Sequence, residues 1–163
     1  MKYWNNLLNH FTVSSSEEKL DRMVNIWHQY QCMVTFNMSR SASYFESGIG
    51  RGMGFRDSCQ DLLGFVHLIP DRARQRILDI ASTSLRMEVL TISISHLPKR
   101  KCWYWKRIQW WPVMAHCRYC CLYSTETGDY SILDEITPYD NDESKSTDFM
   151  EHLRRSFNYT RTH

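Results

Sequence analysis

Four of the six glycines in this 163-residue chain stand at every second position of one short stretch, Gly48, Gly50, Gly52 and Gly54. Glycine disfavours a helix and permits positive φ angles and a close approach of the backbone. No helix is therefore expected to run through this stretch. We predict an ordered loop over residues 37–56, with helical segments on both sides.

The segment before the loop has a clear helical pattern. A capping box is available, with Ser14 three residues before Glu17 or Ser15 three residues before Glu18. Apolar residues then recur at helical spacing and predict a helix over about 16–35. They are Leu20, Met23, Val24, Trp27, Tyr30 and Val34.

Further helices are expected after the loop. Ser58, with Asp61 three residues later, is predicted to cap one helix, and Pro70 suits the first turn of the next. Residues 129–135 and 148–157 predict two shorter helices. The fold class is therefore mainly α, built from paired helices, with a site on the loop side.

An abrupt change in composition divides the chain. Residues 89–125 contain no Asp or Glu but four of the six tryptophans, whereas residues 126–151 hold nine of the eighteen acidic residues. Residues 99–123 interleave basic and aromatic side chains, which is compatible with nucleic-acid binding. Cys117 and Cys120 form one C-x-x-C pair without a clean second pair, so we expect no metal site.

Overall charge and hydropathy exclude several classes of protein. The formal net charge is only +2, which argues against a nucleic-acid binder that is basic throughout. No run of eighteen apolar residues predicts a membrane span, and the N-terminus lacks the pattern of a signal peptide. We therefore expect a cytoplasmic protein with reduced cysteines and no membrane partner.

The loop also concentrates groups that bind anions and sugars. Arg40, Arg51 and Arg56 surround it, together with Asp57. Arginine binds phosphate or carboxylate through two parallel hydrogen bonds, and an ionised aspartate accepts hydrogen bonds from hydroxyl groups. The alternative is a solvated loop with structural ion pairs.

Residues 3–83 resemble the cellobiose phosphorylases of glycoside hydrolase family 94, and the resemblance resumes at 126–135 and 151–153. It is carried by the segments at 4–8, 33–41, 48–58, 61–64 and 73–78, which include Asn37-Met38-Ser39-Arg40-Ser41 and Gly52-Met53-Gly54-Phe55-Arg56-Asp57-Ser58.

This resemblance implies part of an (α/α)6 barrel and an inverting phosphorolysis of cellobiose, or a related β-linked disaccharide, to α-glucose 1-phosphate and glucose. Phosphate would attack the anomeric carbon while a carboxylic acid protonates the leaving oxygen. By resemblance Arg40 and Asp57 hold the transferred glucosyl unit, Arg51 helps to hold phosphate, and Arg56 adjoins them. No cofactor is required, and a homodimer is possible for the intact enzyme.

The resemblance also fails in places. The catalytic acid of the family lies on a Trp-Asn-Asp segment that these residues do not contain, so we expect them to be inactive alone. Cys59 and His28 stand where asparagine is usual. Residues 84–125 resemble the family only when suitable codons are read in shifted frames, which would also explain the tryptophans.

The sequence therefore predicts three parts. Residues 1–83 form the N-terminal part of the helical-barrel domain, residues 84–125 a frame-shifted and poorly ordered segment, and residues 126–163 a resumed helical segment. Two other functions stay open. One is a non-catalytic helical remnant, and the other is a basic aromatic nucleic-acid-binding module in residues 99–123.

Overall fold

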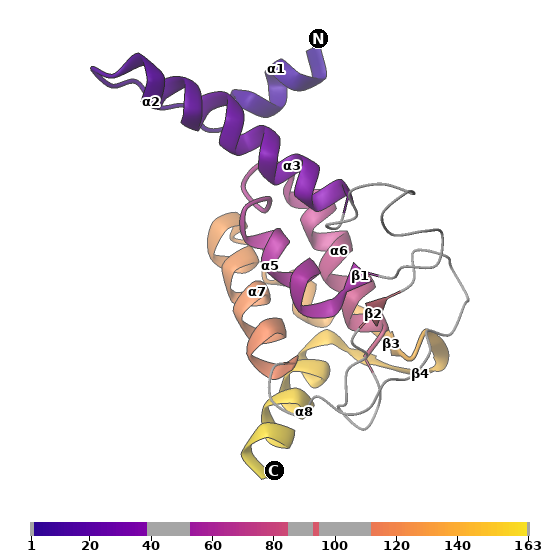
Figure 1. Cartoon of the computed structure of the whole chain (residues 1–163). Helices are drawn as coiled ribbons and strands as arrows, with labels where there is room; N and C mark the ends of the chain where they lie inside the picture. Colours follow the sequence, from indigo (N-terminus) through magenta and orange to yellow (C-terminus); the bar gives the residue numbers. More distant parts are fainter. Residues whose placement is uncertain (1, 39–52, 85–92, 95–111, 163) are drawn as a thin grey trace.

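The computed structural model describes residues 2–38, 53–84, 93–94 and 112–162, and these form a mainly helical protein with two small sheets (Figure 1). In chain order the helices are α1 (Lys2–Leu8), α2 (Glu18–Arg22), the π-helix η1 (Met23–His28), α3 (Gln29–Met38), α5 (Phe55–Leu63), α6 (Pro70–Ser82), α7 (Pro112–Thr127), the 3-10 helix η2 (Ser131–Asp134) and α8 (Phe149–Thr162). The strands are β1 (Met53–Gly54), β2 (Ser93–Ile94), β3 (Ile136–Tyr139) and β4 (Asp142–Asp148).

The predicted first helix is confirmed, but its start and its middle differ from the prediction. α2, η1 and α3 follow one another without a break from residue 18 to residue 38, with π-helical geometry between α2 and α3. Glu17 is the N-cap and its side chain accepts from the Lys19 N–H. Ser15 instead pairs with Asp21, whose carboxylate accepts from the Ser15 N–H at 3.0 Å and from its hydroxyl at 2.7 Å. Neither predicted capping box forms.

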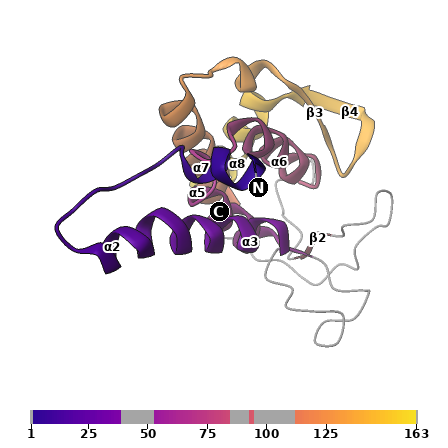
Figure 2. The same cartoon turned by 90° about the horizontal axis from the view of Figure 1, so that it is seen from above.

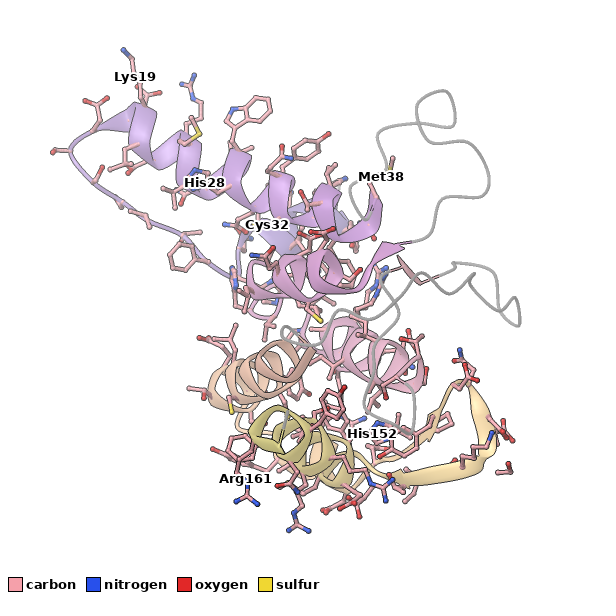
Figure 3. All side chains as sticks on the ribbon, turned by 60° about the horizontal axis from the view of Figure 1, so that its bottom comes forward. Lys19, His28, Cys32, Met38, His152 and Arg161 are labelled. Carbon is pink, nitrogen blue, oxygen red and sulfur yellow. The ribbon has the colours of Figure 1, made fainter. Side chains whose placement is uncertain are left out.

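This continuous helix projects from the rest of the molecule, and we call residues 18–38 the arm (Figure 1). Figure 2 shows the connection between α1 and α2 reaching outward to the free end of the arm. In Figure 3 Lys19 lies at that end, while Cys32 and Met38 lie where the arm meets the other helices. Only the second half of the arm contributes buried side chains, namely those of Gln29, Met33 and Phe36.

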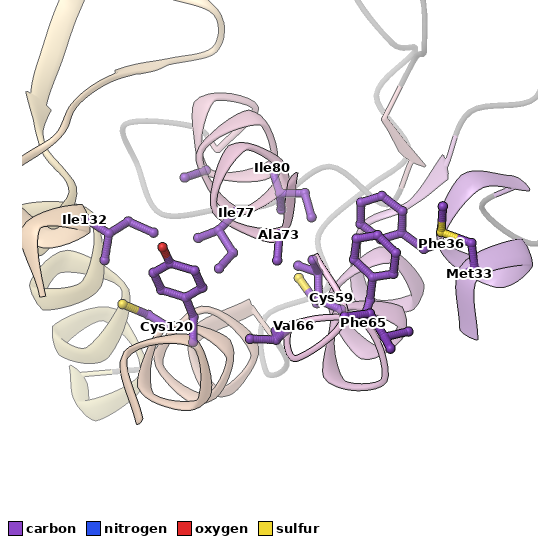
Figure 4. Packing of buried hydrophobic residues seen from close by; sticks show 14 of the residues in the cluster. Met33, Phe36, Cys59, Phe65, Val66, Ala73, Ile77, Ile80, Cys120 and Ile132 are labelled. Carbon is purple, nitrogen blue, oxygen red and sulfur yellow. The ribbon is translucent and has the colours of Figure 1, made fainter. Parts of the chain in front are cut away.

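The core lies where the end of the arm meets α5, α6 and α7 (Figure 4). Phe36 of the arm stacks on Phe65 with ring centroids 3.7 Å apart and an angle of 6° between the rings. The predicted helix at Pro70 is confirmed, since α6 starts there and buries Ala73, Ile77 and Ile80. The same core also contains the buried side chains of Leu62, Val66, Leu68, Cys120, Ile132 and Phe149.

Helix α7 occupies part of the segment that we expected to be irregular. It runs from residue 112 to residue 127 and packs against α5, α6 and α8. Cys120 and Tyr123 on α7 are buried in the same core as the earlier helices. Residues 112–125 of this segment are therefore helical, and Cys120 and Tyr123, three residues apart, lie on the face that packs in the core. A shift of reading frame here stays a prediction.

The C-terminal region differs from the predicted pair of helices. Only a 3-10 turn, η2, forms within residues 129–135, and a β-hairpin of β3 and β4 follows it. Asp140 and Asn141 form the hairpin turn with φ angles of +53° each. These positive angles suit the right-handed twist of a two-residue hairpin turn, and asparagine and aspartate tolerate them. The predicted last helix is confirmed as α8, whose first turn Asp148 caps through the Glu151 N–H.

This hairpin turn also caps α6. The Asn141 N–H donates to the carbonyl of Ser82, and the Asp140 N–H donates to the carbonyl of Ser84, both at 2.8 Å. The last carbonyls of a helix lack partners within the helix and need donors from elsewhere. The turn therefore fixes the end of α6 against the C-terminal region.

Candidate functional site

The structure describes only part of the predicted sugar and phosphate site. Arg40 and Arg51 lie outside the described residues. Arg56 and Asp57 are the second and third residues of α5, in its first turn. Asp57 is half-buried, which leaves part of its surface open to solvent. The structure therefore places these two residues next to one another in the chain and leaves their relation to Arg40 and Arg51 untested.

A short strand leads directly into this first turn. Gly54 pairs with Ser93 and Met53 with Ile94 in an antiparallel two-stranded sheet, and α5 begins at the next residue, Phe55. A carboxylate in the first turn of a helix is stabilised by the unpaired N–H groups there. The local fold therefore holds Asp57 at a helix N-terminus.

Ser58 does not cap this helix as predicted, because α5 already starts three residues earlier. Its hydroxyl is buried and has no hydrogen-bond partner among the described residues. The neighbouring Cys59 thiol is also buried, and burial together with the charge of Asp61 raises its pKa well above the usual range. A thiol that remains protonated is a poor nucleophile, so Cys59 belongs to the core.

Arg72 and Arg76 of α6, to which the sequence analysis assigned no role, contact the end of the arm. The guanidinium groups of Arg76 and Arg72 lie 4.8 and 5.3 Å from the centre of the Phe36 ring. Arg72 also donates to the side chain of Asn37 at 3.1 Å. Burial lowers the pKa of Arg76. Arg72 and Arg76 stand four residues apart on α6, which puts both on one helix face. This spacing is the feature of the sequence that could have identified the pair.

These arginines bring positive charge to the residues that immediately precede the 39–52 segment. Asn37 and Met38, which we predicted to begin the loop, are instead the last two residues of α3. Arginine stacked on an aromatic ring is held in a defined orientation. The end of α3 therefore contacts two arginine side chains, and the charges of Asp79 and Asp61 also act on Arg76.

A second polar cluster joins the two segments that carry the resemblance. The guanidinium group of Arg74 contacts Asp129 at 3.2 Å and Glu135 at 2.7 Å. The Tyr123 hydroxyl donates to Asp129 at 2.8 Å. Hydrogen bonds from Ser131, then from Tyr123 and Arg74, lower the pKa of Asp129 to about 2 despite the opposing effect of desolvation. The ionised carboxylate of Asp129 therefore connects the residues before η2 to α6 through its ion pair with Arg74.

The described residues show no arrangement suited to a metal ion. Within the ranges given above, no group of three or more His, Cys, Asp or Glu side chains converges. Cys120 is buried and its neighbour Cys121 is exposed, so the two thiols point to different sides of α7. None of the described helices is both long and apolar enough to cross a membrane.

The sequence model of the glycosyl hydrolase 94 superfamily catalytic domain matches residues 3–94. This range includes the arm, the predicted loop, α5 and α6. The chain belongs to this superfamily. Arg40, Arg51, Arg56 and Asp57 all lie within the matched residues. The match does not reach residues 126–163, where the resemblance stays a prediction.

Curated relatives align with about half of the chain. An N,N'-diacetylchitobiose phosphorylase from Vibrio proteolyticus is 37% identical over 78 residues, and one from Vibrio furnissii is 35% identical over 79 residues. A cyclic beta-(1,2)-glucan synthase from Rhizobium meliloti is 35% identical over 80 residues. These alignments cover 48–49% of this chain. They cover 10% of each phosphorylase and 3% of the synthase, so this family 94 chain spans a small part of its relatives.

Proposed function

We propose that this family 94 chain contributes the sugar- and phosphate-binding loop of a disaccharide phosphorylase. The observation that carries the proposal is the family match over residues 3–94, which contains all four predicted site residues. Two relatives at 35–37% identity are named N,N'-diacetylchitobiose phosphorylases. These findings do not favour the nucleic-acid-binding alternative for residues 99–123.

In this proposal the four predicted site residues bind two different groups, the transferred glycosyl unit and phosphate. Asp57 and Arg40 hold the hydroxyl groups of the transferred glycosyl unit, Arg51 holds phosphate, and Arg56 adjoins them. An ionised carboxylate accepts hydrogen bonds from sugar hydroxyls, and arginine donates two parallel bonds to an oxyanion. The position of Asp57 in the first turn of α5 supports its role, because it directly follows the predicted loop in the chain.

The reaction in this proposal is phosphorolysis with inversion at the anomeric carbon. A phosphate oxygen forms the new bond to that carbon as the bond to the bridging oxygen breaks, and a general acid protonates the departing sugar. We propose cellobiose or a related β-linked disaccharide as the substrate. The names of the relatives make N,N'-diacetylchitobiose the second candidate.

Binding to the 163-residue chain tests this division of roles. We expect inorganic phosphate and cellobiose each to perturb the NMR spectrum of the chain. Arg51→Ala is expected to weaken phosphate binding by about 10-fold or more, since a charge-assisted hydrogen bond contributes roughly 1.5–3 kcal/mol. Asp57→Asn is expected to weaken cellobiose binding and to leave phosphate binding unchanged.

Arg154→Ala is the matched control, because Arg154 is exposed on α8 and outside the family match. A loss of phosphate binding in Arg154→Ala equal to that in Arg51→Ala would overturn the assignment of Arg51. Comparing cellobiose with N,N'-diacetylchitobiose in the same titration decides between the two substrates.

Turnover is a separate measurement. A general acid contributes about 10²–10⁴-fold to a rate, and these 163 residues lack the Trp-Asn-Asp segment on which the family carries it. We therefore expect binding without release of glucose 1-phosphate from cellobiose and phosphate. Release of glucose 1-phosphate by the purified chain would show that another carboxyl group serves as the acid.

A further inference from the structure

The side chain of Asn37 connects the end of the arm to α6. Its amide nitrogen donates to the Met33 carbonyl at 2.9 Å, and its oxygen accepts from the Arg72 guanidinium group at 3.1 Å. Both ends of the amide are therefore bound, one to the arm itself and one to α6. These two bonds fix the orientation of Asn37 in the last turn of α3.

The neighbouring ring of Phe36 brings three parts of the fold together. It stacks on Phe65, which lies in the turn after α5 (Figure 4). It also contacts the guanidinium groups of Arg72 and Arg76 on α6. Phe36 and Phe65 are both buried, so their stack anchors the arm in the core. The contact with α6 then continues from this ring to the last turn of the arm.

The last turn of a helix attracts positive charge, because its final carbonyl groups carry a partial negative charge. Helix α3 ends at Met38, and the Arg72 guanidinium group binds Asn37, one residue earlier. Arg76 stands one turn further along α6, and the charge of Asp61 on α5 also acts on it. The end of the arm is therefore held by packing and by favourable charge from α6.

The arm and α5 flank the segment that contains the first two predicted site residues, Arg40 and Arg51. Arg40 follows Asn37 by three residues, and Asp57 is the third residue of α5. In the proposed function Arg40 and Asp57 hold the same glycosyl unit. Two groups that bind one ligand must keep a fixed separation, and a misplacement of about 1 Å in such a site can cost about 100-fold in rate. The orientation of the last turn of the arm therefore matters for sugar binding.

We propose that Arg72 is a positioning residue of the sugar site. It acts through Asn37 and fixes the last turn of the arm, from which the chain continues to Arg40. Arg72 itself does not contact the sugar. This inference rests on the proposed function, since it requires Arg40 and Asp57 to bind the same glycosyl unit.

Loss of Arg72 should weaken sugar binding without a large loss of stability. Arg72 and Asn37 are both exposed, and interactions between exposed side chains contribute little to the free energy of folding. The buried stack of Phe36 and Phe65 stays in place in Arg72→Ala. We expect a Tm within about 2 °C of the wild-type value and a dissociation constant for cellobiose that rises about 3- to 10-fold.

NMR titration of the full 163-residue chain with cellobiose measures this effect, at about 0.15 M salt so that long-range charge effects are screened. Arg72→Lys keeps a positive charge and a donor for Asn37, so cellobiose binding should recover to within about 2-fold of the wild type. Asn37→Ala should weaken binding as much as Arg72→Ala. The double variant should bind no more weakly than either single variant, because both substitutions remove the same bond.

Arg74→Ala is the matched control, because Arg74 lies between Arg72 and Arg76 on α6 but contacts Asp129 and Glu135 in the C-terminal region. Removal of its ion pairs should lower Tm and leave the dissociation constant for cellobiose unchanged. Equal weakening of cellobiose binding in Arg74→Ala and Arg72→Ala would overturn the proposal, since it would reflect a loss of stability alone.

Titration with inorganic phosphate separates positioning from a direct effect of charge. Arg51, the predicted phosphate ligand, is close in the chain to β1 and not to the arm. Arg72→Ala should therefore weaken phosphate binding less than cellobiose binding. A larger loss for phosphate would overturn the proposal, because it would show that Arg72 attracts the anion directly.

Asp57→Asn, measured in parallel, distinguishes this inference from the proposed function. Weaker cellobiose binding in both Asp57→Asn and Arg72→Ala, with recovery in Arg72→Lys, is the expected result. Weaker binding in Asp57→Asn with unchanged binding in Arg72→Ala would overturn the inference and leave the proposed function standing. No cellobiose binding by the wild-type chain would overturn both.

Discussion

The arm passes close to Gly64, which directly follows α5, and this leads to a specific prediction. A Cβ atom added at this position would lie 2.8 Å from the Sγ atom of Cys32 and 3.5 Å from its Cβ atom. Real side chains essentially never approach a Cβ atom as closely as 2.8 Å. Gly64→Ala therefore forces the Cys32 thiol or the arm to move.

Two opposing free-energy changes decide the outcome. Gly64 does not have a positive φ, since Gly128 is the only such glycine among the described residues. Alanine fits this backbone, and Gly→Ala at such a position stabilises by about 0.4–1 kcal/mol through the entropy of the unfolded chain. Overpacking a close contact costs roughly 1–3 kcal/mol. We expect a net destabilisation of about 0.5–2 kcal/mol, or a fall in Tm of about 2–6 °C.

The sign should reverse when the thiol is removed. In a Cys32→Ala background only the 3.5 Å contact with the Cβ atom remains, so Gly64→Ala should stabilise by about 0.4–1 kcal/mol. Urea unfolding of the four chains of this double-mutant cycle measures the coupling, which we expect to be about 1–3 kcal/mol. Stabilisation by Gly64→Ala in the wild-type background, or equal effects in both backgrounds, would refute the reasoning.

Two further predictions concern the core and the C-terminal region. Phe36→Ala removes a buried ring from the stack with Phe65, so unfolding experiments should show a loss of about 3–5 kcal/mol; a similar loss in Phe157→Ala, at an exposed ring, would contradict this. The buried His152 ring forms hydrogen bonds with the Ser84 hydroxyl at 3.1 Å and with the Thr137 carbonyl at 3.0 Å. Burial lowers the pKa of His152 below the usual 6.5. Because the unfolded chain takes up a proton just below pH 6.5 while folded His152 stays neutral, stability should fall as the pH drops below about 6.5. Burial lowers the pKa of His67 too, with the same consequence. Urea unfolding at a series of pH values measures this effect, and His152→Gln should reduce the fall in stability. His28→Gln, at an exposed position, is the control and should not reduce it. An undiminished fall in His152→Gln would contradict the attribution of the pH dependence to His152.

Local sequence signals located most helices of the described chain. Pro70 marked the start of α6, and the apolar spacing before the glycines marked the arm. Both signals act through neighbouring residues, because a fixed φ angle and a periodic apolar face are properties of a single segment. Signals of this kind failed at Ser58, where the strand β1 leads into α5 before the serine is reached.

The candidate site was predictable as a set of residue types and as a place in the chain. The prediction that Arg40, Arg51, Arg56 and Asp57 bind sugar and phosphate came from their chemistry and from the family resemblance. All four lie within the family match, and their roles stay a prediction. Arg72 and Arg76 were missed, since their approach to Phe36 depends on packing between α6 and the arm. The grouping of Arg40 and Arg51 with Asp57 stays a prediction.

The sequence by itself determined the helical class and the family, because each depends on residue types at short spacing. Tertiary structure alone decided that the apolar face of the arm points outward, since the hydrogen bonds of Asn25 and Gln29 to the preceding segment set the rotation of the helix. It also decided that the turn at Asp140 and Asn141 caps α6 more than fifty residues earlier. Backbone donors and acceptors find such partners only when distant segments pack together, and no local pattern records that.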